Sequence, residues 1–310
     1  MSVEHFWQTA SEARPKYWST PEEGEAIWAQ LKLVPDGCRV LEVGTAAGHV
    51  TRALKHKGCE ITGIELDKTL AESAAPSCRR MIVGDIEALD LDVELPEEFD
   101  TILCGDVLEH LKDPDAVLRK LKRRLAPGGH LVVSMPNVAH GSVRLGLLLG
   151  RFTYVEEGLL DATHLRFFTL ASIIDLFNRN GLEILDLHRA RLKIFDTEIH
   201  IDRSQVSAFA VRQVLGDPEA TVYQFVFRAI PSRRANTLAD LRDPAFDAAR
   251  ELRGFHVLCM KKAWEAFHRQ ENGRFDARAW AWLALVAQPS LKAALHWVRS
   301  YVPFSAKRAG

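Results

Sequence analysis

The sequence lacks several features that would place a protein in a class at once. It contains no run of about 18 apolar residues, so we expect no membrane-spanning helix. Residues 1–10 show no basic segment followed by an apolar stretch, so we also expect no signal peptide. The net charge is only −1, and nothing in it demands a nucleic-acid partner. These absences favour a globular protein of the cytoplasm.

Cysteine is scarce and unpatterned. The five cysteines are odd in number and form no C-x-x-C pair, which argues against a disulfide framework or a structural zinc site. Most lie in or beside apolar runs, where a thiol usually packs as a small core hydrophobe. This cysteine usage favours a reducing compartment.

Positive charge is concentrated at the end of the chain. From residue 231 onward there are 14 Lys and Arg against 7 Asp and Glu. This segment is rich in Ala, Trp and Arg and has helical spacing. We therefore expect a first domain over residues 1–231, with a helical cap at about 1–36, and a basic, Trp-rich helical extension over 232–310. The extension could lie on a membrane surface or hold a partner, although packing on the first domain is the simpler expectation.

Short apolar runs alternate with helical segments in the first domain. Strand-like runs occupy residues 38–43, 60–65, 80–83, 99–104 and 130–134, with helices at 49–56, from 68 and at 113–125. Residues 127–129 (PGG) would end the third helix. Helices at 146–152 and 170–180 and strands at 182–187 and 221–230 follow. The alternation predicts right-handed βαβ units and a mostly parallel α/β sheet.

The strongest motif follows the first predicted strand. Residues 42–48 (EVGTAAG) place glycines where a strand turns into a helix, and such glycines let the backbone approach a ligand. The dinucleotide pattern G-x-G-x-x-G fails here, because its second glycine is Ala46 and its third is His49. A carboxylate at Glu42 is unfavourable beside a phosphate and favourable beside a cation. The loop therefore suits a ligand that has no pyrophosphate.

This loop resembles the first motif of the class I S-adenosylmethionine-dependent methyltransferases, with Ala46 in place of the middle glycine. The resemblance implies a Rossmann-like doubly wound, seven-stranded sheet and S-adenosylmethionine as cofactor. Acidic residues also end the next three strands, where ligands bind in open α/β sheets. By the resemblance, Glu65 would hold the ribose, and Asp85 with Ile86 the adenine. The expected cofactor-binding residues are Glu42, Gly44, Thr45, Ala46, Gly48, Glu65, Leu66, Asp85, Ile86, Gly105 and Asp106.

Further motifs narrow the resemblance to the small-molecule branch of the family. They are residues 106–111 (DVLEHL), 134–137 (SMPN) and 163–169 (THLRFFT). This branch includes ubiquinone-type O-methyltransferases and methyltransferases of sugar and cell-surface glycan pathways. The resemblance implies a small-molecule or glycan-type acceptor, methylated at oxygen. An N-methyltransferase of an amino sugar and a methyltransferase-like scaffold with little turnover remain alternatives.

A hydroxyl acceptor needs a base, and histidine suits that role near neutral pH. His164 is the first candidate and His140 the second, because both follow the fifth predicted strand. Either could instead be structural. Asp106, Glu109 and His110 could share a helix face and bind a metal, but the same pattern is an ordinary helix start. We therefore expect no metal.

Overall fold

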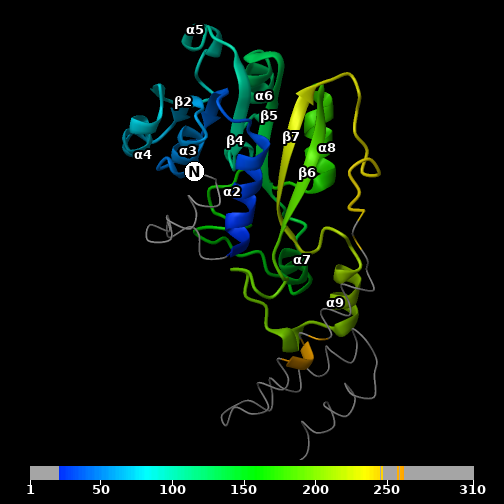
Figure 1. Cartoon of the computed structure of the whole chain (residues 1–310). Helices are drawn as coiled ribbons and strands as arrows, with labels where there is room; N and C mark the ends of the chain where they lie inside the picture. Colours follow the sequence, from blue (N-terminus) through cyan, green and yellow to red (C-terminus); the bar gives the residue numbers. More distant parts are fainter. Residues whose placement is uncertain (1–20, 245, 247–256, 258, 262–310) are drawn as a thin grey trace, which may run out of the picture. The chain divides into compact units, whose positions relative to one another are not determined.

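The computed structural model describes residues 21–244, 246, 257 and 259–261 (Figure 1). Seven strands form one sheet in the order β3-β2-β1-β4-β5-β7-β6. They are β1 (Arg39–Val43), β2 (Glu60–Glu65), β3 (Arg80–Val83), β4 (Phe99–Gly105), β5 (Leu125–Pro136), β6 (Leu182–Arg191) and β7 (Val222–Pro231). The first five strands pair in parallel, and β7 runs antiparallel to both β5 and β6. The predicted mostly parallel seven-stranded α/β sheet is confirmed.

Helices connect these strands. The α-helices are α2 (Pro21–Leu33), α3 (His49–His56), α4 (Lys68–Ala74), α5 (Leu91–Glu94), α6 (Pro114–Lys122), α7 (Gly141–Leu148), α8 (Leu170–Arg179) and α9 (Ala208–Leu215). Short 3₁₀ turns are η2 (Ala75–Ser77), η3 (Leu108–His110) and η4 (Arg203–Gln205). Side-chain caps fix several helix starts: the Asp67 carboxylate accepts from the Leu70 N–H, and Asp113 does the same for Ala116 ahead of Pro114.

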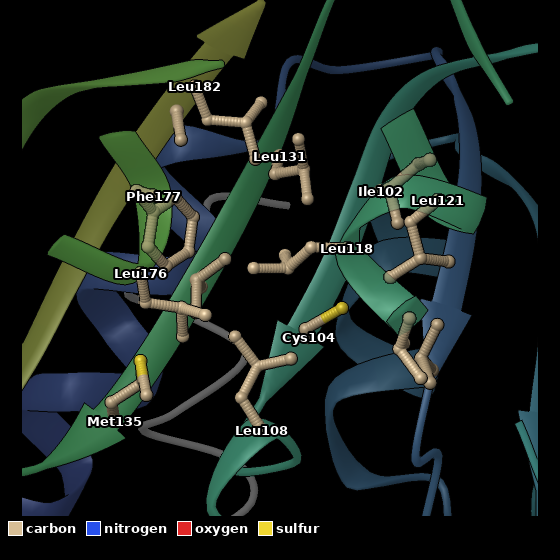
Figure 2. Close-up of a cluster of buried hydrophobic side chains, with 14 of the residues drawn as sticks. Ile102, Cys104, Leu108, Leu118, Leu121, Leu131, Met135, Leu176, Phe177 and Leu182 are labelled. Atoms are coloured by element: carbon tan, nitrogen blue, oxygen red, sulfur yellow. The ribbon is translucent and has the colours of Figure 1, made fainter. Parts of the chain in front are cut away.

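The two faces of the sheet build separate cores, because successive side chains of a strand point to opposite faces. One core places Leu41, Ile102 and Leu131 against α6 and α8. Figure 2 shows this cluster, in which Leu118 and Leu121 of α6 and Leu176 and Phe177 of α8 gather around β4 and β5. The other core places the adjacent residues Val40, Leu103 and Val132 against α2 and α3. The sheet is therefore covered by helices on both faces, as the doubly wound prediction requires.

Two predicted boundaries are wrong. Helix α6 ends at Lys122, and residues 127–129 lie inside β5. Phe99 pairs with Leu125 while Thr101 pairs with His130, so residues 126–129 form a bulge in which Gly128 has φ +80°. The helix predicted at 146–152 instead spans Gly141–Leu148. It starts earlier because a ring nitrogen of His140 caps it by accepting from the Ser142 N–H.

The described residues fall into two compact units. Unit 1 holds the sheet and comprises the described residues up to Val138, Tyr154–Leu192 and Val222–Arg242. Unit 2 comprises Ala139–Thr153, Lys193–Thr221 and the described residues from Asp243 onward, and its core lies between α7 and α9. The predicted boundary at residue 231 thus differs from this division, since residues 232–242 belong to unit 1. Most of the predicted extension, including its tryptophans, and residues 1–20 of the predicted cap lie outside the described residues.

Within the described part of the chain, no helix has the length and apolar character needed to cross a bilayer.

Candidate functional site

The predicted cofactor residues gather at one edge of unit 1. Strands β1 to β4 are parallel, so the loops that follow them meet at the carboxyl edge of the sheet. Glu42 and Glu65 lie at the ends of β1 and β2, and Asp85 and Asp106 lie just after β3 and β4. The structure therefore brings together the four carboxylates that the sequence placed separately.

The loop after β1 is built around two glycines in the left-handed region. Gly44 has φ +75°, and a Cβ at this position would lie 2.8 Å from the Val107 Cγ2 atom. Gly48 has φ +79°, and its Cβ would lie 2.8 Å from the Ala74 Cα atom. No larger residue fits either position without displacing its neighbours. Between them, Ala46 has φ 45° and adopts the same left-handed region, where its Cβ methyl group makes this conformation less favourable than it is for glycine.

Glu65 holds this loop in place. Its carboxylate accepts a 2.8 Å hydrogen bond from the Ala46 N–H and a 3.0 Å bond from the Asp67 N–H. The side chain is only 9% exposed. Because each carboxylate oxygen accepts more than one bond, Glu65 retains lone pairs for the ribose hydroxyls that the prediction assigns to it.

Glu42 is a buried carboxyl group with an unsatisfied oxygen. It is 3% exposed, and its Oε2 atom has no hydrogen-bond partner, nor does the neighbouring Thr45 hydroxyl. Burial raises the pKa of Glu42 to about 8; the Thr51 side chain opposes this shift, and the charge of Glu65 adds to it. A buried carboxyl oxygen without a partner is costly unless a ligand completes it. An ammonium group, such as that of S-adenosylmethionine, would do so, and the residues present therefore fit this cofactor.

The remaining predicted contacts lie on the outer strands of the same edge. Asp85 is exposed and its carboxylate accepts from the Glu87 N–H at 2.8 Å, which fixes the turn after β3. Ile86 is buried at 7% exposure, whereas Leu66 after β2 is 70% exposed. Leu66 is thus an apolar side chain that a flat ring could cover.

Asp106 is the centre of a polar network at the end of β4. Its carboxylate accepts a 3.0 Å bond from the Ser134 hydroxyl and a short bond from the Gln224 side-chain amide. Ser134 in turn accepts from the Gln30 side-chain amide at 3.0 Å. Asp106 has φ 54°, and burial raises its pKa although its surface remains accessible. Asp106 is thus held among protein groups but keeps a face open to solvent, so it can contact a small ligand.

Sequence reasoning missed Gln30 and Gln224. They reach Ser134 and Asp106 from α2 and β7, far away in the chain. Gln30 also fills the space above Gly105, where a Cβ would lie 2.7 Å from its Oε1 atom. No local sequence pattern marks an isolated glutamine, so Gln30 and Gln224 could be recognised only once the positions of α2 and β7 were known.

Beyond Asp106, three ionisable side chains converge. Glu109, His110 and His164 each offer one atom that could ligate a metal, and these three atoms lie within 4.8 Å of one another. The approach depends on the segment before α8, in which the N–H groups of Leu165 and Arg166 both donate to the Glu109 carbonyl oxygen at 2.9 Å. The motif at residues 163–169 is therefore the segment that places His164 beside Glu109. Asp106 itself, which the sequence grouped with Glu109 and His110, is bound instead to Ser134 and Gln224.

Glu109 is fully buried, and neither carboxyl oxygen has a hydrogen-bond partner. Burial raises its pKa well above the ordinary range, and the charges of Asp106 and Asp161 add to the shift. A divalent cation could take Glu109, His110 and His164 as ligands.

The two histidines are oriented by different partners. The Thr163 hydroxyl donates to the Asp161 carboxylate at 2.6 Å, so it accepts from His110 Nδ1, which lies 3.2 Å away. His164 stacks edge-on against His110 with ring centroids 4.8 Å apart. One His164 ring nitrogen bonds the Leu159 backbone, and the buried Nδ1 atom has no partner. Burial lowers the pKa of His164, so this ring is neutral and Nδ1 keeps a lone pair.

His140 has a different environment. It is fully buried, and its Nδ1 atom lies 2.8 Å from the Ser142 hydroxyl while capping α7. These contacts favour a structural role in unit 2 over a catalytic one. Arg166 donates to the Lys112 carbonyl oxygen.

The sequence is similar to those of known methyltransferases. Residues 11–187, more than half of the chain, match the family model described as a methyltransferase domain. A ubiquinone biosynthesis O-methyltransferase of Pseudomonas syringae pv. tomato is 32% identical over 190 residues, which are 59% of this chain and 79% of that protein. The corresponding enzyme of Pseudomonas entomophila is 29% identical over the same shares.

Among solved structures, a TehB-like methyltransferase of Corynebacterium glutamicum covers 74% of this chain and 98% of its own, with 18% identity and a TM-score of 0.42. The family model, the curated relatives and the sheet order lead to one assignment. The chain belongs to the methyltransferase family, and S-adenosylmethionine is its methyl donor.

Proposed function

We propose that this enzyme methylates an oxygen atom of a small-molecule or glycan-type acceptor at the carboxyl edge of β4 and β5. The cofactor would lie across the loops after β1 to β4, held by the residues predicted from the sequence. Its amino group would meet Glu42, its ribose Glu65, and its adenine Asp85 and Ile86. The acceptor would then approach from the side of Asp106 and His164.

The observation that carries the proposal is the cluster of Glu109, His110 and His164 beside Asp106. Methylation of a hydroxyl requires a group that takes its proton. His164 supports this role because burial lowers its pKa and its Nδ1 atom, which the protein covers, has no hydrogen-bond partner. The relatives named above are called O-methyltransferases, which is consistent with a site built to remove a hydroxyl proton.

Bound S-adenosylmethionine supplies a methyl group on a positively charged sulfur. The residues of this chain have three tasks around it. Gly44 and Gly48 leave the loop after β1 without side chains, so its backbone can approach the cofactor closely. The network of Gln30, Ser134 and Gln224 fixes Asp106, which orients the acceptor hydroxyl. His164 would take up the hydroxyl proton, directly or through one water molecule, and the acceptor oxygen would then be able to take the methyl group.

The surroundings of His164 support an acceptor with an apolar or ring-shaped surface. Phe167 lies edge-on to His164 with ring centroids 6.1 Å apart, and Tyr154 lies 6.4 Å from Phe167. Tyr154 is 55% exposed and Leu165 53% exposed. Aromatic faces bind both aromatic rings and the apolar faces of sugars, so either acceptor class fits.

The test is methyl transfer to a panel of acceptors. Purified full-length enzyme would be supplied with S-adenosylmethionine carrying a labelled methyl group and, in separate reactions, a polyprenyl catechol, a free sugar glycoside and an amino sugar. Label transferred to a hydroxyl of the first or second supports the proposal and selects the acceptor class. Label on the amino sugar nitrogen alone would overturn the oxygen assignment in favour of an N-methyltransferase. Cofactor binding without transfer to any acceptor or to cell extract would favour a scaffold.

A further inference from the structure

Two cysteines meet at the edge of the sheet opposite the cofactor site. Cys38 precedes β1 and Cys59 precedes β2. The first register pair of these parallel strands joins Arg39 to Glu60, and the Glu60 N–H donates to the Cys38 carbonyl oxygen at 3.0 Å. The two cysteines are therefore direct neighbours across the strand pair. Neighbouring strands lie about 4.8 Å apart, within the Cα separation of about 4.4–6.8 Å that a disulfide spans.

Both sulfur atoms point to the same place. The Cys38 Sγ atom lies 3.2 Å from the Pro35 carbonyl oxygen, and the Cys59 Sγ atom lies 3.4 Å from it. Both Cβ atoms therefore direct their sulfurs toward one carbonyl oxygen, and this convergence is the second geometric requirement of a disulfide.

The two thiols differ chemically. The neighbouring Cys38 side chain and the backbone of Cys38 and Gly37 favour a negative charge on the Cys59 sulfur, and Lys57 adds positive charge nearby. These groups outweigh burial and lower the pKa of Cys59 to about 7, whereas the neighbouring Cys59 and burial raise that of Cys38. Cys59 is thus the more readily ionised sulfur, and Cys38 is the thiol that can resolve it.

A small oxidant can reach the pair. The turn formed by Pro35, Asp36 and Gly37 is exposed, Cys38 is partly exposed, and Cys59 is 8% exposed. Cys104, by contrast, is fully buried in the core between the sheet and α6.

We propose that Cys38 and Cys59 are a redox-sensitive modification site at which hydrogen peroxide converts two thiols into a disulfide. The Cys59 thiolate attacks one peroxide oxygen, the O–O bond breaks, and the products are a sulfenic acid and, after protonation, water. The Cys38 sulfur then attacks the Cys59 sulfur and expels a second water, which takes up the Cys38 proton. Two thiols are oxidised by two electrons in total, and one peroxide is reduced to two waters.

The bond would enclose the segment that holds the cofactor. Between Cys38 and Cys59 lie β1 with Glu42, the loop from Gly44 to Gly48, and α3. A crosslink across this segment restricts the unfolded chain more than the folded one. Oxidation should therefore raise the melting temperature of the cofactor-free protein by several degrees and leave cofactor binding in place.

The experiment uses the full chain with all five thiols reduced. It is treated with hydrogen peroxide at neutral pH, its free thiols are alkylated, and its peptides are mapped by mass spectrometry. We expect an intramolecular peptide pair joining Cys38 to Cys59, with no dimer on a non-reducing gel. In Cys38→Ser, which removes the resolving thiol, dimedone should trap a sulfenic acid on Cys59.

Cys78→Ser is the matched control. Cys78 is also partly exposed and packs against the same hydrophobic core as Cys38, but burial raises its pKa to about 11. The crosslink should form equally well in this variant. Full alkylation of Cys38 and Cys59 after peroxide treatment would overturn the proposal. So would a crosslink through Cys78, or dimedone labelling of Cys78 equal to that of Cys59.

Discussion

The Ala46 N–H donates a 2.8 Å hydrogen bond to the Glu65 carboxylate, so the last residue of β2 holds the loop that follows β1. This bond explains how an alanine serves where the family pattern has a glycine. Ala46 adopts φ 45°, a region that costs a non-glycine residue about 1 kcal/mol. The bond from a buried carboxylate offsets that cost, and Glu65 thereby has two roles, in the loop and at the ribose.

The first prediction concerns this double role. Glu65→Ala should weaken S-adenosylmethionine binding by about 100-fold or more, because it removes the loop support together with a charged hydrogen-bond acceptor. Glu60→Ala is the control on the same strand, since Glu60 forms a surface ion pair with Arg79 and such pairs contribute little. Calorimetric titration measures both. Equal affinities for the two variants would refute the role of Glu65.

The second prediction concerns the protonation of Glu42. Its pKa of about 8 means that the cofactor-free protein holds a proton there at pH 7. If the cofactor ammonium pairs with the carboxylate, binding must release that proton. Titrations at pH 7 in buffers of different ionisation enthalpy should show a release that vanishes above about pH 9 and in Glu42→Gln. Identical release by the variant would exclude the pairing.

The same shift makes Glu42 a destabilising residue in the cofactor-free protein. The folded-state pKa lies above the ordinary value of 4.5, so stability is full below that pH and is lost as the pH rises to about 8. Glu42→Gln should therefore raise the free energy of unfolding at pH 8 by about 1–3 kcal/mol while weakening cofactor binding. Thermal unfolding as a function of pH is the measurement. A variant less stable than the wild type at pH 8 would contradict this account of its burial.

The third prediction assigns the base. His164→Ala should lower turnover by about 100-fold or more with little change in cofactor affinity. The pKa of His164 is lowered from its ordinary value of 6.5 by burial and by His110, so kcat/KM should fall only below that pH. The variant should lose this acid limb. The control is His188→Ala, because His188 lies on β6 and pairs with Glu25 of α2. An unchanged pH profile in His164→Ala would place the base elsewhere.

The fourth prediction separates proton transfer from metal catalysis at Glu109, His110 and His164. If His164 accepts the proton directly, dialysis against EDTA should leave turnover unchanged, and the protein should contain no stoichiometric divalent ion. A loss of turnover that Mg²⁺ or Zn²⁺ restores would instead make these three residues metal ligands. Elemental analysis of the purified protein checks the result independently.

Local sequence chemistry predicted the strands and helices that build the cofactor edge. The bounds of β2, β3 and α3 agree with the structure because apolar runs end there at turns, glycines or caps. The start of α7 was missed because its cap is His140, a residue that rarely caps helices. The bulge at residues 126–129 was missed because PGG suits both a helix end and a distorted strand.

Long-range contacts limited how much of the site could be predicted from the sequence. The four strand-end carboxylates follow from sheet topology alone, and the sequence placed them correctly on their strands. The approach of His164 to Glu109 depends on the path of a segment 55 residues further along the chain, which no spacing rule fixes. Gln30 and Gln224 likewise become part of the site only when α2 and β7 take their places beside β5.

The most direct test of the account compares two glycines. Gly44 and Gly128 have φ values of +75° and +80°, so valine strains the backbone at both positions. Only at Gly44 would a Cβ also contact Val107, at 2.8 Å, since Gly128 has nothing within 4 Å. Titration with S-adenosylmethionine should show binding abolished in Gly44→Val and retained in Gly128→Val. Undiminished binding by folded Gly44→Val would contradict the placement of the cofactor at this loop.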